Sequence, residues 1–284
     1  MPVSIPPLLA KHCAKTEERR QWLEALPNSI AAVQERWGLS LAEPFDHMYV
    51  SCSWVALATL ADGSRAVLKM GMPHFEAEQE MEGLQFWNGD AAVRLLASDR
   101  RRNAMLLERC EPGTPLFSIP EREQDLVITS MLRRLWKTPQ QSDFRPLSAL
   151  IEYWSEETRK LRDKWSDSVV NEGLQVLAAL AAEPRDGVLL ATDLHSGNVL
   201  RAQREPWLMI DPKPFVGDPA YDLTQHLINC EERLQTNPHD LIQRVADLAQ
   251  VDADRVRLWL FGRAAAEPRD QWTNWKTDLA RKLS

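Results

Sequence analysis

The chain changes texture at a proline- and glycine-rich segment, Glu111-Pro112-Gly113-Thr114-Pro115, and this change limits the folds that it can adopt. Before the segment, short runs rich in Val, Trp and Leu alternate with turn residues, which is typical of antiparallel strands. After it, apolar residues recur mainly at helical spacing. The 284 residues therefore predict an α+β fold, with a strand-rich first part and a mainly helical second part.

The spacing of apolar and turn residues predicts the individual elements. In the first part we expect a helix over 14–37 interrupted near Pro27, strands over 45–50, 54–60, 65–70, 92–97 and 104–108, and a helix over 75–87. Asp62-Gly63 predicts a tight hairpin turn. In the second part we expect helices near 119–137, 147–165, 168–183, 219–235, 239–249, 252–266 and 270–282, with short strands over 188–192, 199–201 and 207–210.

Composition excludes several classes of protein. The net charge is -7 and no basic stripe is present, which argues against a nucleic-acid binder. The longest apolar run, Val176 to Ala182, is far shorter than the roughly 18 residues of a membrane span, and the first residues lack the order of a signal peptide. The four cysteines form no CxxC pair and the six histidines no HExxH-like pair. These features predict a cytoplasmic protein with reduced thiols.

Two strand ends carry the strongest chemical signal. Asp193-Leu194-His195-Ser196-Gly197-Asn198 follows one apolar strand, and Ile210-Asp211-Pro212 closes another. This pattern puts two carboxylates and one amide oxygen at neighbouring strand ends. Such hard oxygen ligands suit Mg²⁺ that bridges phosphates, with one carboxylate left as a base.

These motifs, D-L-H-x-G-N followed by I-D-P, resemble the catalytic loop and metal-binding aspartate of the aminoglycoside phosphotransferases, which have a protein-kinase-like bilobal fold. The runs 92–96, 107–109 and 225–234 resemble its streptomycin 6-phosphotransferase and hydroxyurea phosphotransferase branch. The resemblance extends from about Phe45 to the mid-240s. It implies that Asp193 is the catalytic base, that Asn198 and Asp211 bind Mg²⁺, and that Asp222 supports the loop through backbone N–H groups.

One departure from the family pattern concerns the residues before the catalytic aspartate. The family usually has His-Gly there, and this chain has Ala191-Thr192. The missing histidine is normally a structural brace, and a branched threonine restricts the backbone. The departure leaves a non-catalytic, nucleotide-binding pseudokinase as an alternative.

The resemblance also implies a nucleotide site for ATP or GTP. Lys69 closes a strand and would bind the α- and β-phosphates, held by Glu80 rather than Glu78. Ser51 and Ser53 would lie in the turn that covers the phosphates, although a plain polar hairpin is the simpler interpretation of these serines. The adenine hinge would contain Met105, Glu108 and Cys110, which contribute mainly backbone contacts.

The substrate residues are the least constrained part of the pattern. His226, Asn229 and Arg233 are spaced as on one helical face, and Glu232 borders it. Trp154 and Asp218 are further candidates. Acids and aromatics suit a cationic, hydroxylated substrate, while solvated helix faces explain each residue equally well.

Together these patterns predict an N-lobe over 1–110, a linker over 111–118 and a helical C-lobe over 119–284. The predicted function is ATP- and Mg²⁺-dependent O-phosphorylation of a small molecule, streptomycin or a related antibiotic, which gives antibiotic resistance. Hydroxyurea is a further candidate substrate. A metabolic amino-alcohol or sugar kinase of the same fold is the first alternative. We expect no nucleic-acid or membrane partner, and a monomer or weak homodimer.

Overall fold

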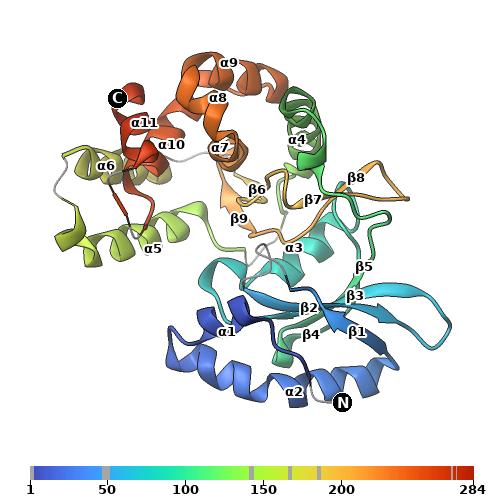
Figure 1. Cartoon of the computed structure of the whole chain (residues 1–284). Helices are drawn as coiled ribbons and strands as arrows, with labels where there is room; N and C mark the ends of the chain where they lie inside the picture. Colours follow the sequence, from blue (N-terminus) through green and yellow to red (C-terminus); the bar gives the residue numbers. More distant parts are fainter. Residues whose placement is uncertain are drawn as a thin grey trace. The chain divides into compact units, whose positions relative to one another are not determined.

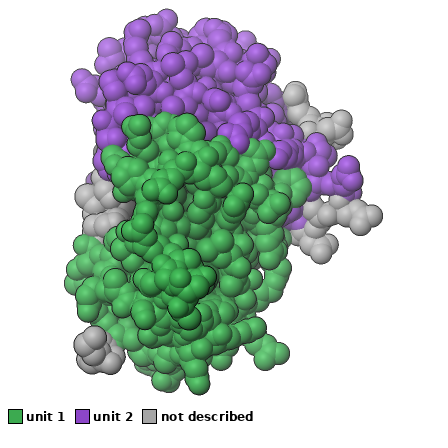
Figure 2. All heavy atoms as spheres, turned by 90° about the vertical axis from the view of Figure 1, so that its right-hand side faces the viewer, with its two compact units in different colours: residues 1–114, 200–210 green, residues 115–199, 211–284 purple. Residues whose placement is uncertain are grey.

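The computed structural model describes residues 3–46, 52–140, 144–165, 168–183, 187–269, 271–272 and 274–284. The chain forms two compact units: unit 1 comprises residues 1–114 and 200–210, and unit 2 comprises residues 115–199 and 211–284 (Figure 2). Residues 200–210 were expected in the helical lobe, but they belong to unit 1. The reason is backbone pairing, because Arg201 N–H donates to Thr114 O at 2.8 Å and Met209 N–H donates to Ala91 O at 2.9 Å.

Unit 1 is built on a five-stranded antiparallel sheet in the order β1-β2-β3-β5-β4 (Figure 1). The strands are β1 Ser40–Pro44, β2 Ser53–Thr59, β3 Arg65–Gly71, β4 Leu95–Asp99 and β5 Ala104–Glu108. A separate pair joins β7 Val199–Arg201 to β8 Trp207–Met209. The strand expected over 45–50 is not found at its first two residues, and the rest of it lies outside the described residues. The strand expected over 92–97 begins later, at Leu95.

The described residues of unit 1 also form the α-helices α1 Pro7–Cys13, α2 Glu17–Trp37 and α3 Glu80–Trp87. Thr16 caps α2 by accepting a hydrogen bond from Arg19 N–H, and Gly38 ends it at a φ of 62°. The expected interruption at Pro27 is wrong, since α2 continues through it. Proline removes one helical hydrogen bond, but the apolar face of α2 buries Leu26 and Ile30 in the core that lies against the sheet.

The register of the strands sorts their residues onto two faces. Ser53 lies opposite Gly71, and Lys69 lies opposite Met105. Side chains alternate along a strand and opposite residues share a face, so Ser53, Lys69 and Met105 lie on the same face of the sheet. The other face carries the apolar residues that pack against α1 and α2.

Unit 2 contains eight helices among its described residues. They are α4 Glu121–Leu135, α5 Leu147–Lys160, α6 Ser168–Ala182, α7 Pro219–Asn229, α8 Glu231–Thr236, α9 Pro238–Ala249, α10 Ala253–Ala266 and α11 Trp275–Leu283. The short strands β6 Val188–Leu190 and β9 Phe215–Gly217 pair antiparallel. Small residues let α6 and α10 approach closely, because a Cβ on Gly173 would lie 2.5 Å from Ala265 Cβ. This packing fixes the position of α10 within the unit.

Some predicted helices are shorter or divided. The helix expected over 219–235 breaks at Cys230, and the one expected over 75–87 begins as a 3-10 turn at Phe75–Ala77. Further 3-10 turns cover Arg100–Arg102, Leu116–Ser118 and Arg162–Lys164. The sequence pattern did not indicate α1 or β9. No helix in the described ranges is long and apolar enough to cross a membrane.

Candidate active site

Asp222 holds the loop that follows β6. Its carboxylate accepts hydrogen bonds from Ala191 N–H at 3.0 Å, Thr192 N–H at 2.6 Å and the Trp136 indole N–H at 3.0 Å. Burial raises the pKa of Asp222 to about 6, although these three donors work to lower it. The expected role of Asp222 as a support of the loop backbone is therefore confirmed, and the contact with Trp136 adds to it.

Thr192 stands where the family usually has glycine, and its backbone has a φ of 49°. A branched residue is strained in this left-handed region. Its hydroxyl, however, donates to Lys213 O at 2.6 Å, and Lys213 N–H donates to Ala191 O at 2.8 Å. These hydrogen bonds join the loop after β6 to the segment after β8. The threonine hydroxyl thus makes a contact that glycine could not make.

Asp193 lies at the centre of the loop, with 30 % of its side chain exposed. Its Oδ1 accepts a hydrogen bond from Gln225 Nε2 at 2.8 Å. Asn198 Nδ2 donates to the backbone oxygen of Asp193 at 3.0 Å and lies 3.4 Å from its Oδ2. The amide nitrogen of Asn198 makes both contacts, so the amide oxygen takes no part in them.

His195 is a neutral member of the loop. Burial lowers its pKa to about 4, which the charges of His226 and Lys213 reinforce and that of Asp211 opposes. Its Nδ1 accepts a hydrogen bond from Gly197 N–H at 3.1 Å, so the neutral ring carries its proton on Nε2. Nε2 lies 3.9 Å from Asp193 Oδ1. A Cβ on Gly197 would lie only 2.8 Å from the ring, which explains the glycine of the motif.

Asp211 follows β8 and has a φ of 54°. Lys213 Nζ lies 2.6 Å from its Oδ1, and 37 % of the Asp211 side chain is exposed. The carboxylate of Asp211 and the amide oxygen of Asn198 are hard ligands from the same unit. Their chemistry fits Mg²⁺, which prefers oxygen donors and a small number of protein ligands.

In unit 1, Lys69 and Glu80 form a buried ion pair. Lys69 Nζ donates to both carboxylate oxygens of Glu80, at 2.6 and 2.7 Å, and the two residues are 7 % and 3 % exposed. The structure thus contains the pair that was expected, between the first residue of α3 and the strand β3. The phosphate contact of Lys69 stays a prediction.

The other expected nucleotide residues also lie in unit 1. Met105 is buried in β5, on the face of the sheet that carries Lys69 and Ser53. Ser51 lies outside the described residues. Glu108 ends β5, and both its carboxylate oxygens accept hydrogen bonds from Arg204 at 2.9 Å. These two hydrogen bonds fix the end of β5, where the adenine hinge is expected.

Cys110 follows this strand end. Burial raises the pKa of the Cys110 thiol to about 12, and the charge of Glu108 acts in the same direction. The thiol is therefore protonated and unreactive at neutral pH. Any part of Cys110 in nucleotide binding rests on its backbone, as the family resemblance implies.

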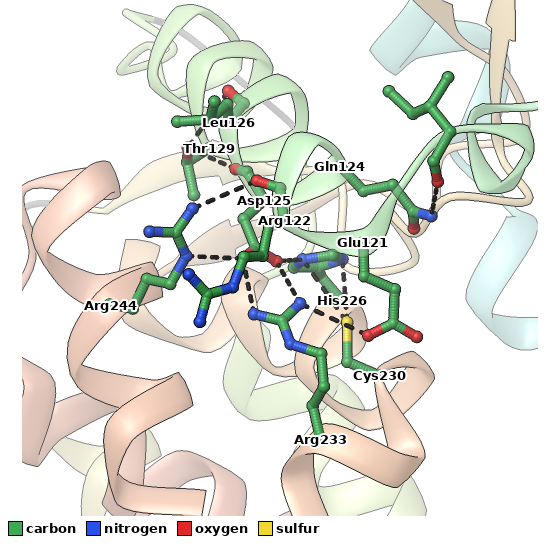
Figure 3. A network of polar contacts seen from close by, with 11 residues as sticks. Glu121, Arg122, Gln124, Asp125, Leu126, Thr129, His226, Cys230, Arg233 and Arg244 are labelled. Carbon is green, nitrogen blue, oxygen red and sulfur yellow. Dashed lines mark hydrogen bonds and ion pairs between the residues drawn. The ribbon is translucent and has the colours of Figure 1, made fainter. Parts of the chain in front are cut away.

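His226 does not lie where the sequence pattern suggested. It is 0 % exposed, and its Nε2 lies 2.9 Å from Oδ1 of the buried Asp125. Arg233 and Arg244 also donate to Asp125, so side chains from α7, α8 and α9 converge on one carboxylate of α4 (Figure 3). His226 is therefore part of a buried ionic network, which removes it from the substrate residues.

The same network contains a group that could suggest a metal site. Ligand atoms of Asp125, His226 and Cys230 lie within 4.8 Å of one another. Two guanidinium groups already neutralise Asp125, however, and burial raises the pKa of Cys230 to about 12. A cation would meet two positive charges and a protonated thiol, so we interpret the cluster as structural.

Trp154 and Asp218 also make contacts inside unit 2. Trp154 is 6 % exposed, and its ring lies 5.1 Å from the Arg263 guanidinium. Asp218 caps α7 and accepts hydrogen bonds from Arg255 and from Trp259 Nε1. These contacts bury both side chains in unit 2, and their expected contact with substrate stays a prediction.

Asn229 and Glu232 differ from them, because both are exposed. Asn229 Nδ2 donates to Gln225 O within its own helix at 2.9 Å. Glu232 borders a surface hollow with Glu231, Gln235 and Thr236. A substrate role for Asn229 and Glu232 stays a prediction.

Comparison with known proteins identifies the family of this chain. A sequence model described as aminoglycoside/hydroxyurea antibiotic resistance kinase matches residues 36–269. The chain belongs to this family. A streptomycin 6-kinase of Streptomyces glaucescens is 35% identical to this kinase over 274 residues, which cover 92% of this chain and 88% of that protein. A hydroxyurea phosphotransferase of Kitasatospora aureofaciens is 36% identical over 252 residues, 86% of this chain and 72% of that protein.

The similarity to solved structures concerns the fold only. A choline kinase from Streptococcus pneumoniae matches with a TM-score of 0.62 and 14% sequence identity, over 89% of this chain and 98% of that chain. Together with the family, this likeness confirms the predicted protein-kinase-like α+β fold class. Family membership also makes the chain a phosphotransferase that acts on a hydroxyl group, which argues against the pseudokinase alternative.

Two residues of this kinase were missed by sequence reasoning, Gln225 and Arg263. Gln225 lies three residues after Asp222, on the helix turn that faces the loop, and this spacing was a usable signal. Arg263 is 3 % exposed and lies in the apolar second half of α10. A single charged residue in an apolar run such as 258–266 indicates a buried and paired charge, although the sequence does not reveal its partner.

Replacing Asp211 with alanine is expected to abolish the effect of Mg²⁺ on ATP binding. The change removes a carboxylate that would bind the Mg²⁺ accompanying the phosphates. Calorimetric titration of ATP with and without Mg²⁺ measures this effect. Asp247→Ala, at an exposed site on α9, is the control. A variant that keeps the wild-type metal effect would show that Asp211 is not the ligand.

Proposed function

We propose that this kinase transfers the γ-phosphoryl group of ATP, with Mg²⁺, to a hydroxyl group of streptomycin, and so gives resistance to that antibiotic. The observation that carries the proposal is the 35% identity to a streptomycin 6-kinase over 92% of this chain. The hydroxyurea phosphotransferase has a similar sequence identity, but this chain covers only 72% of its length, compared with 88% of the streptomycin 6-kinase. An acidic chain of net charge -7 also favours a cationic substrate over a neutral one.

In this proposal Asp193 accepts the proton of the substrate hydroxyl. The hydroxyl oxygen forms a bond to the γ-phosphorus, the bond from that phosphorus to the β,γ-bridging oxygen breaks, and ADP leaves. Asp193 suits this task because its carboxylate is partly exposed and accepts a hydrogen bond from Gln225 of α7. Little covalent chemistry is required of the protein, so positioning and charge stabilisation dominate.

The remaining roles follow the chemistry of each group. Lys69, held by Glu80, binds the α- and β-phosphates, and Ser53 on the same sheet face lies near them. Asn198 and Asp211 would hold Mg²⁺, which would neutralise the charge of the phosphates. The backbone at Glu108 and Cys110 pairs with the purine.

Purified enzyme tests the proposal through ADP formation with ATP and Mg²⁺. We expect turnover with streptomycin, and a fall in kcat/KM as ionic strength rises, because salt screens the attraction of a cationic substrate. Hydroxyurea and choline serve as neutral and amino-alcohol comparisons, and GTP replaces ATP in a parallel assay. Turnover with choline or hydroxyurea but none with streptomycin would contradict the proposed substrate.

A further inference from the structure

A side-chain amide joins the expected catalytic base to a buried charge. Gln225 lies on α7, and its Nε2 donates to Asp193 Oδ1 at 2.8 Å. Its Oε1 accepts a hydrogen bond from Arg263 Nη2 at 2.7 Å. An arginine can only donate and a carboxylate can only accept, so the orientation of the amide between them is fixed by chemistry. The oxygen must face Arg263 and the nitrogen must face Asp193.

Arg263 is itself held from several sides. Its Nη1 donates to Thr224 Oγ1 at 2.8 Å, and its Nη2 pairs with Glu267 at 3.1 Å. The guanidinium also lies 5.3 Å from the centre of the Tyr221 ring. Burial works to lower the pKa of Arg263, but the charges of Glu267 and Asp193 raise it, so the group stays charged. A buried, multiply bonded arginine is a rigid support for the amide of Gln225.

We propose that Gln225, oriented by Arg263, is the positioning residue that holds the Asp193 carboxylate in its reactive orientation. The inference rests on the proposed role of Asp193 as base. The contacts of Asp193 with His195 Nε2 and, through Oδ2, with Asn198 Nδ2 are longer, at 3.9 and 3.4 Å. Gln225 therefore gives one carboxylate oxygen a short, directed hydrogen bond, which restricts rotation of the carboxylate. Small misplacements of a reacting group are costly, so the bond matters to turnover.

Gln225→Glu tests the proposal with almost no change of shape. A glutamate keeps an oxygen for Arg263 but presents a second oxygen, in place of the N–H donor, to Asp193. The like charges repel and the Asp193 carboxylate turns away. We expect kcat to fall at least about tenfold, within the range for misplaced catalytic groups, while KM for ATP changes less than about twofold. A kcat that stays at the wild-type value would overturn the proposal.

A double-mutant cycle with Asp193→Asn measures the contact itself. Asparagine at position 193 can donate to the new glutamate, so the repulsion is absent in the double variant. We expect Gln225→Glu to lower Tm in the wild-type background and to lower it less than half as much in the Asp193→Asn background. Equal losses in both backgrounds would show that Gln225 does not act on Asp193. This readout is independent of activity, so it stands even if Asp193→Asn retains turnover, which would instead remove the proposed role of Asp193.

Gln243→Glu is the matched control. Gln243 Nε2 donates to Asp247 Oδ1 at 2.8 Å on the exposed face of α9. The substitution makes the same chemical change beside another aspartate, at the same cost in net charge. We expect its kcat to equal that of the wild type, since solvent screens the repulsion. A loss of kcat as large as that of Gln225→Glu would overturn the proposal, because charge alone would then explain it.

Discussion

Replacing Asp193 with asparagine is expected to lower kcat by at least about 10²-fold, the usual size of a general-base contribution. Asparagine keeps the shape of the side chain but cannot accept the proton of the substrate hydroxyl. Affinity for nucleotide is expected to change little, because the phosphate contacts that we propose come from other residues. Steady-state kinetics with streptomycin and calorimetric titration of ATP measure the two effects.

Asp254→Asn is the control for this substitution. Asp254 lies on α10 with 87 % of its side chain exposed, so loss of its charge is expected to leave kcat unchanged. Turnover by Asp193→Asn within about threefold of the wild type, far less than a general base contributes, would refute the role of Asp193 as base.

Replacing Asp125 with alanine is expected to lower the free energy of unfolding by about 3 kcal/mol, the lower end of the range for breaking a buried ion pair. Asp125 is fully buried, and two arginines and His226 donate to it. Removing the carboxylate leaves these groups without their shared acceptor. Arg233 and Arg244 keep 26% and 34% of their side chains exposed, which limits the loss because water can solvate them.

Glu121→Ala provides a control within the same network. Glu121 lies 3.5 Å from Arg233 and 44% of its side chain is exposed, so its loss is expected to cost less than about 1 kcal/mol. Urea unfolding followed by circular dichroism gives both values. If Asp125→Ala costs no more than Glu121→Ala, the network does not stabilise unit 2.

The pH range of this contribution follows from the pKa of Asp125. Burial alone would raise this pKa, but the hydrogen bonds from His226, Arg233 and Arg244 hold it well below its usual range. A carboxyl group whose folded-state pKa is depressed stabilises the fold above its unfolded pKa of about 4, and loses this effect as the pH falls further. The difference between the wild type and Asp125→Ala should therefore be constant from about pH 5 to 8 and shrink in acid.

The sequence predicted the residues whose roles depend on local pattern. Asp193 and Asp211 stand at strand ends, and Lys69 closes a strand just before the helix that carries Glu80. Such positions can be recognised because strands are short, regular and flanked by turn residues. The family resemblance then implied a role for each residue. For Asp222 the structure contains the expected hydrogen bonds to the loop backbone.

The residues that sequence reasoning misjudged depend on contacts between distant helices. His226 and Arg233 were expected on one helical face near the substrate, but the helix breaks at Cys230 and both side chains turn to Asp125. Helical spacing shows which residues share a face, and it does not show which face is buried when both carry polar groups. The contact of Arg263 with Gln225 is equally hidden, because it depends on how α10 packs against α7.

We propose above all that this kinase transfers a phosphoryl group to a streptomycin hydroxyl with Asp193 as base. Phosphorus NMR of the purified wild-type enzyme with Mg²⁺, ATP and streptomycin tests it most directly. We expect one phosphate monoester signal that grows in step with ADP, and no such signal over the same time with Asp193→Asn. Formation of ADP with inorganic phosphate alone, or an ester signal that grows equally fast with Asp193→Asn, would contradict it.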